Sequence, residues 1–103
     1  MKNLLISWEL PIERELGGVL DVTEIAHVAV AGSANGGVDY APLGNIAPPD
    51  LNVAVNDVAF GDWIFRFITV DTNGAQSSGL EVPYTVADDS PPLNVGNVTI
   101  TPV

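Results

Sequence analysis

One run of alternating aromatic and aliphatic side chains constrains the fold of this chain more than any other feature. Trp63, Phe65 and Phe67 occupy every second position of the run, and residues two apart lie on the same face of a β-strand. Gly61 precedes the run and Asn73-Gly74 follows it, as at the ends of a strand that enters a hairpin. The run therefore predicts a strand within an antiparallel sheet.

Further segments have the same period of two, and turns that contain glycine or proline separate them. No segment has the period of a helix longer than one turn. The spacing of strands and turns is typical of an all-β sandwich of two antiparallel sheets with about seven strands. Besides residues 63–71, the expected strands lie within residues 3–10, 25–31, 38–46, 51–55 and 80–87.

The composition limits the class of partner. Of the 103 residues, 47% are hydrophobic, which suffices for the core of one domain. Thirteen acidic residues against three basic ones give a formal net charge of −10. We therefore expect no nucleic-acid partner and no anionic membrane partner, because both need lysine and arginine. There is no cysteine, so neither a disulfide nor thiol chemistry is available.

No targeting segment is evident at the N-terminus. Met1-Lys2 precedes an apolar run that is too short for a secretory signal peptide. No run approaches the ~20 apolar residues of a membrane helix. We expect a small gene product synthesised in the cytoplasm without a signal peptide, or a domain excised from a larger protein.

No set of side chains predicts catalysis, and we expect no enzyme activity, no cofactor and no metal site. His27 is the only histidine and lies among small apolar strand residues, where packing is its expected role. Asp71 with Asn73, or Asp88-Asp89, could supply oxygen ligands to Ca²⁺, but their spacing matches no Ca²⁺-binding loop.

Carbohydrate binding would use exposed aromatic side chains on one face of a sheet. Trp8 and Trp63 both fall on strand positions that are expected to face the core. We therefore expect the two tryptophan rings to be buried, and the carboxylates of Asp71, Asp88 and Asp89 to be solvated in turns.

Two segments resemble strands of the fibronectin type III fold. Residues 5–11, Leu-Ile-Ser-Trp-Glu-Leu-Pro, are similar to the second strand of that family, and residues 61–71 are similar to the sixth. Asn73-Gly74 and Ser77-Ser78 continue the likeness in the same order, so that it covers about residues 3–87. The resemblance implies an immunoglobulin-like β-sandwich.

The chain departs from that family at three places. Trp63 stands where the family usually has a tyrosine whose hydroxyl bonds back to the preceding turn, so that this hydrogen bond must be absent or replaced. His27 stands where an aromatic side chain often packs. The first family strand is missing, whereas residues 91–101 look like a first strand that follows the last one.

The expected division is a sandwich over residues 1–87 and a proline-containing linker with a C-terminal strand or arm over residues 88–103. Val98 and Ile100 alternate with threonines, so the arm can bury one face. It is expected to supply the missing first strand, either of its own sandwich or of a neighbouring copy. Donation, or another contact between subunits, is favoured because donation needs no crossing of the sandwich. The arm residues expected at an interface are Leu93, Val95, Val98 and Ile100.

A second interface is expected on one sheet face. Two strands that should be neighbours carry apolar side chains on both of their faces, whereas a sheet with one wet face alternates apolar and polar residues. A partner that covers the outer face would explain this pattern, and so would the general preference of β-branched residues for strands. The residues expected on the outer face are Val28, Val30, Ile64 and Ile68.

The family resemblance implies a non-enzymatic structural or interaction protein. Similar modules are abundant in bacteriophage structural proteins, so the expected role is a virion subunit: a head-decoration, cement or tail-associated protein. Its expected partners are other virion proteins, of the capsid or tail, and copies of itself. The alternative is a carbohydrate- or surface-binding accessory module of a bacterial extracellular enzyme or of a phage fibre.

Overall fold

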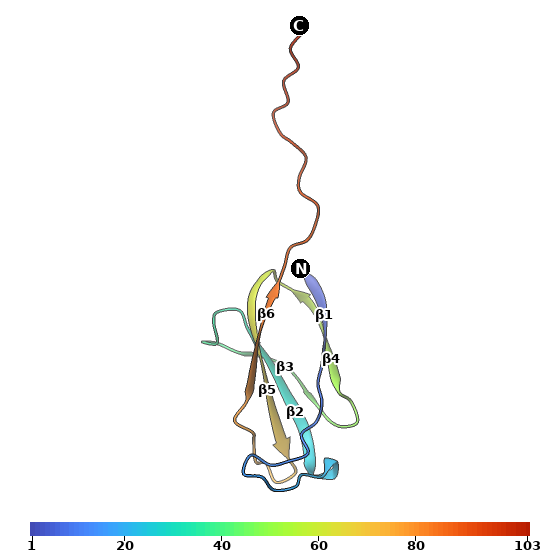
Figure 1. The fold of residues 1–103 in the computed structure, drawn as a ribbon, viewed down its shortest axis with the longest axis vertical. Helices are drawn as coiled ribbons and strands as arrows, with labels where there is room; N and C mark the ends of the chain where they lie inside the picture. Colours follow the sequence, from blue (N-terminus) through green and yellow to red (C-terminus); the bar gives the residue numbers. More distant parts are fainter.

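The computed structural model describes residues 1–103 and contains six β-strands and one turn of 3₁₀ helix (Figure 1). The chain is all-β, as its alternating pattern predicts. In chain order the elements are β1 (Lys2–Ser7), η1 (Val22–Glu24), β2 (Ile25–Ser33), β3 (Ala41–Ile46), β4 (Asn52–Val58), β5 (Gly61–Asp71) and β6 (Leu80–Val86).

The strands form two antiparallel sheets that face each other. The smaller sheet pairs β1 with β4, and the larger has the order β3-β2-β5-β6. Trp8, just after β1, lies with its ring centroid 6.0 Å from that of Phe67 in β5, so side chains of the two sheets meet between them. The predicted pair of sheets is confirmed, with six strands instead of about seven because residues 93–103 pair with no strand.

The register of β2 against β5 decides which side chains form the core. Val28 pairs with Thr69 and Val30 with Phe67, and residues opposite each other in a sheet point to the same face. Val28 and Val30 are accordingly only 3% and 2% exposed. The expectation that they lie on the outer face is wrong. Alternation alone leaves open which of the two faces is buried. A β-bulge between Ile25 and His27 also puts Ile25, which is 5% exposed, on the buried side with Val28 although the two residues are an odd number of positions apart.

The hairpin between β2 and β3 folds back over the outer face of the larger sheet. Its turn contains Gly36 and Gly37 at φ +75° and +88°, a conformation that glycine adopts without steric cost. The Gly37 amide donates to the Ser33 hydroxyl at 3.0 Å. Ser33 is 1% exposed, so the turn itself covers this end of the outer face.

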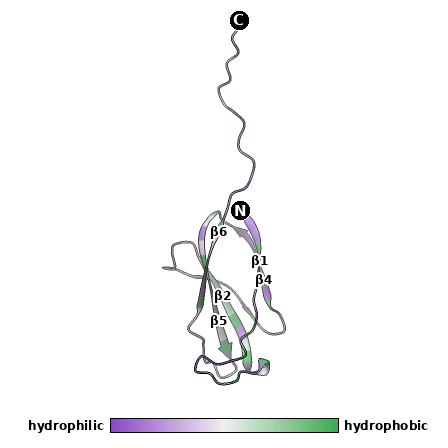
Figure 2. Cartoon of the chain, in the orientation of Figure 1, coloured by the Kyte–Doolittle hydropathy of each residue, from purple (hydrophilic) through white to green (hydrophobic).

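The last segment, residues 87–103, leaves the sandwich and is called the C-terminal arm here. It extends from the end of β6 at the pole where β1 begins, and it makes the molecule 81 Å long against 27 and 20 Å in the other directions (Figure 1). All of its residues are exposed. In Figure 2 the hydrophobic colouring instead follows β2 and β5, in the centre of the larger sheet.

Candidate binding groove

The sandwich is open along one side, between the edge strands β1 and β6. β1 pairs with β4 on one edge only, and β6 pairs with β5 on one edge only. The facing edges of β1 and β6 share no ladder of hydrogen bonds. An unpaired strand edge presents a row of free N–H and C=O groups and is a template for another strand.

Two adjoining hollows between these strands form one apolar groove. The larger has a volume of about 620 Å³ and the smaller about 220 Å³. Ile6, Phe67 and Val82 line both, so the hollows are continuous. The apolar residues that line this β1–β6 groove are Leu4, Leu5, Ile6, Trp8, Val28, Phe65, Phe67, Leu80, Val82 and Tyr84.

The groove wall on β6 consists of core-type side chains that nothing covers. Leu80, Val82 and Tyr84 pair with Phe67, Phe65 and Trp63 of β5 and therefore share the inner face of the sheet. They are nevertheless 64%, 40% and 51% exposed. Their alternation in the sequence correctly predicts an apolar face. The sequence analysis did not predict that this face is uncovered. The one signal in the sequence was that no strand was expected to pair with the free edge of residues 80–87.

The smaller sheet contributes the opposite wall. Leu4, Ile6 and Trp8 are half-buried and alternate with exposed residues. The indole Nε1 of Trp8 is shielded from solvent and has no hydrogen-bond partner, a state that costs free energy for a buried donor. The side of the groove formed by Leu4, Ile6 and Trp8 is therefore aliphatic and aromatic, whereas Ser7, Glu9, Thr69, Ser77 and Ser78 add polar groups to the larger hollow.

An ion pair holds the base of the arm beside the groove. Lys2 Nζ donates to Asp89 Oδ2 at 3.0 Å. The pKa of Asp89 is lowered below its ordinary value, chiefly by this hydrogen bond. The pair joins the first residue of β1 to the arm, so the arm starts at the end of the groove where β1 begins.

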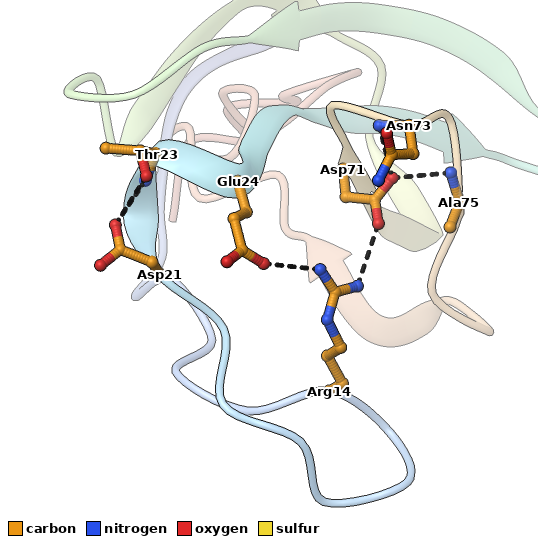
Figure 3. Close-up of polar contacts among 7 residues, drawn as sticks. All are labelled: Arg14, Asp21, Thr23, Glu24, Asp71, Asn73 and Ala75. Atoms are coloured by element: carbon orange, nitrogen blue, oxygen red, sulfur yellow. Dashed lines mark hydrogen bonds and ion pairs between the residues drawn. The ribbon is translucent and has the colours of Figure 1, made fainter.

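A polar cluster lies at the opposite pole of the sandwich (Figure 3). Arg14 donates from Nη1 to Asp71 Oδ2 at 3.0 Å and from Nη2 to Glu24 Oε2 at 2.6 Å. Asp71 Oδ1 also accepts the amides of Asn73 and Ala75 at 3.0 and 2.8 Å. The cluster ties the loop before η1 to the end of β5, and its residues serve the fold.

The pKa of Asp71 is lowered by the Arg14 hydrogen bond first, and then by the backbone amides. Its oxygens are therefore already occupied and charge-paired. Asp88 accepts from Ser90 and Asp89 pairs with Lys2, so these acidic side chains also have hydrogen-bond partners within the chain. No group of three or more histidine, cysteine, aspartate or glutamate side chains is placed to hold a metal ion.

The outer face of the larger sheet holds two of the residues expected at an interface. Ile64 and Ile68 pair with Ser33 and Ala29 and are half-buried. Tyr40 contributes to this cover: the Arg66 guanidinium carbon lies 4.1 Å from its ring centroid, and its hydroxyl donates to Glu81 at 3.0 Å. The chain's own hairpin thus shields Ile64, which lies beside Gly37.

The remaining candidate residues lie apart from one another. His27 is half-buried in β2 opposite Val70. Trp63 stacks on Phe65 with centroids 5.9 Å apart, and both tryptophans face the core side as predicted. The arm residues Leu93, Val95, Val98 and Ile100 contact neither sheet and are exposed.

No helix is both long and apolar enough to cross a membrane. What the chain does must be inferred from its own residues, since no family model, no curated protein and no solved structure matches it.

Proposed function

We propose that this chain is a non-enzymatic structural and interaction protein with a fibronectin type III-like sandwich. One observation carries the proposal: a single chain combines an apolar groove beside an unpaired strand edge with a projecting arm of exposed apolar residues. Both features are of the kind that binds protein by strand addition, in which backbone bonds supply affinity and side-chain pockets supply specificity.

The energetics favour a partner for the groove. Each large apolar side chain that passes from exposed to fully buried contributes about 1.5–3 kcal/mol. Leu80, Val82 and Tyr84 are all available for such burial. The outer face is less suited to this role, because the hairpin that contains Tyr40 already shields Ile64.

The biological setting that we propose is a bacteriophage virion, with the chain as a head-decoration, cement or tail-associated subunit. This part rests on the resemblance of residues 3–87 to modules that are abundant in phage structural proteins. The strongly acidic surface fits it, since a net charge of −10 keeps free subunits apart before assembly.

Mass spectrometry of density-purified particles, made by the genome that encodes the chain, tests the setting. We expect its peptides in a fixed ratio to a capsid or tail protein. Absence from the particles would overturn the virion role. Binding of the recombinant chain to a glycan array, at affinities that Tyr84→Ala lowers, would favour the carbohydrate-binding alternative instead.

A further inference from the structure

The β1–β6 groove requires an occupant of defined shape. It must be an extended strand, because the free edge of β1 offers hydrogen bonds at strand spacing. It must have one apolar face, because Ile6, Phe67 and Val82 line the floor. We propose that residues 93–103 of a second copy of this chain fill the groove, so that copies join head to tail. The inference rests on the proposed role as an interaction protein and names its partner.

The arm carries alternating apolar side chains that could cover the apolar side chains of the groove. Val98 and Ile100 alternate with Thr99 and Thr101, so one face is apolar and the other is wet. Leu93 and Val95 stand an odd number of residues before Val98, which places the two apolar pairs on opposite faces of a regular strand. Asn97, which lies between the two pairs, has φ +53°. A left-handed residue at this point is typical of a β-bulge, and a bulge returns both pairs to one face.

The length of the arm also matches. Residues 93–103 span roughly 35 Å when extended. β1 has six residues, roughly 20 Å, so the arm can cover the whole edge and still leave residues at either end.

The direction of the arm favours a second copy over its own sandwich. The arm departs from the pole where β1 begins and points away from the fold (Figure 1). If it enters a neighbour at the opposite pole, it runs antiparallel to that neighbour's β1 without changing direction. If it folds back along its own β1 from its base at Asp89, it must reverse and run parallel, a pairing slightly less stable per residue. Pro91-Pro92 favours extended backbone at the point where that reversal would occur.

The contact that results uses different surfaces on its two sides, the arm of one copy and the groove of the next. Such a heterologous contact builds a chain of copies or a ring, according to whether the rotation between neighbours closes. Every copy carries a charge of −10, so salt should promote the association by screening repulsion.

The first test measures native mass by light scattering, with the full chain at increasing concentration and at two salt concentrations. We expect species larger than the 10.8 kDa monomer, with the fraction assembled rising with concentration and salt. Ile100→Asp should lower the fraction assembled at least tenfold, since it places a charge on the apolar face. Thr99→Asp adds the same charge on the wet face and should assemble nearly as the parent does. Both positions lie in the exposed arm, so neither substitution disturbs the sandwich.

The second test distinguishes donation from self-completion. The chain has no cysteine, so single cysteines report without interference. Leu5 is an exposed residue of β1 at the rim of the smaller hollow. It alternates with the half-buried Leu4 and Ile6, so an inserted arm would place its threonines on the same side as Leu5. A mixture of Leu5→Cys and Thr99→Cys chains should form a mixed disulfide dimer under mild oxidation. Ile100→Asp, added to the Thr99→Cys chain, should abolish this dimer. A monomeric disulfide in the double variant, with none in the mixture, would show self-completion and overturn the proposal.

The outcome is separable from that of the virion test. A chain that is incorporated into particles equally well with and without Ile100→Asp would overturn arm donation and leave the virion role standing. A chain that polymerises through its arm but is absent from particles would overturn the virion role and leave arm donation standing.

Discussion

The indole nitrogen of Trp63 donates to the carbonyl oxygen of Ala59 at 2.9 Å. Ala59 lies in the turn that joins β4 to β5, so the side chain at the start of β5 bonds back to the turn before it. The bond fastens the start of β5 to this turn.

Trp63→Phe should therefore destabilise the chain by the loss of this bond as well as of ring volume. A typical intramolecular hydrogen bond contributes about 0.5–1.5 kcal/mol. Trp8→Phe is the matched control, because it removes the same atoms from an indole whose Nε1 has no partner. Urea unfolding of both variants measures the difference. A Trp63→Phe variant no less stable than Trp8→Phe would show that the bond to Ala59 contributes nothing.

Arg14→Met should loosen the pole that the arginine holds. The substitution removes the bonds to Asp71 and Glu24 (Figure 3), which connect the loop to the end of β5 and to η1, and the melting temperature should fall by several degrees. Hydrogen exchange should accelerate at the Leu20 amide, which bonds to Ile12 within the same loop. Arg66→Met is the control, since Arg66 stacks on Tyr40 and forms no bond to this loop. Unchanged protection of Leu20 would contradict the role of Arg14.

Stability should decline in acid, in part through Asp71. Its pKa is lowered in the folded chain, chiefly by Arg14, so its contribution is complete above the unfolded pKa of about 4. The contribution is lost as the pH falls through the lower folded value. Asp71→Asn keeps an oxygen for the Asn73 and Ala75 amides but cannot titrate.

The urea midpoint, measured from pH 7 to pH 2, should fall less steeply for Asp71→Asn than for the parent chain. Some slope should remain, because Glu15, Asp21, Asp88 and Asp89 also have lowered pKa values. Parallel curves for the two proteins would show that Asp71 does not couple to folding.

The two faces of the larger sheet should respond differently to a buried charge. Val30→Asp should unfold the chain, because Val30 is among the most deeply buried side chains and an unpaired carboxylate there cannot be solvated. Ile64→Asp should leave a folded chain with a looser β2–β3 hairpin, and its assembly through the arm should be unchanged. Circular dichroism and native mass measure both outcomes. Unfolding by Ile64→Asp would show that the hairpin cover is part of the core.

The strands were predictable because their signal is local. The alternation in residues 61–71 and 80–86 required only neighbouring residues, and the turns at Gly36-Gly37 and Asn73-Gly74 required only glycine's tolerance of positive φ. The all-β class, the two sheets and the inward direction of Trp8 and Trp63 followed from these patterns. The assignment of Val28 and Val30 to the outer face failed because alternation leaves open which of two faces is buried.

The sequence by itself determined where the strands lie and which side chains alternate, because these follow from backbone geometry within a few residues. Only the tertiary structure decided the register of β2 against β5, since a bulge at residues 25–27 depends on pairing between distant segments. It also decided that β1 and β6 stand as facing free edges. Leu80, Val82 and Tyr84 have the pattern of core residues, and they remain exposed because no other strand within residues 1–103 covers them.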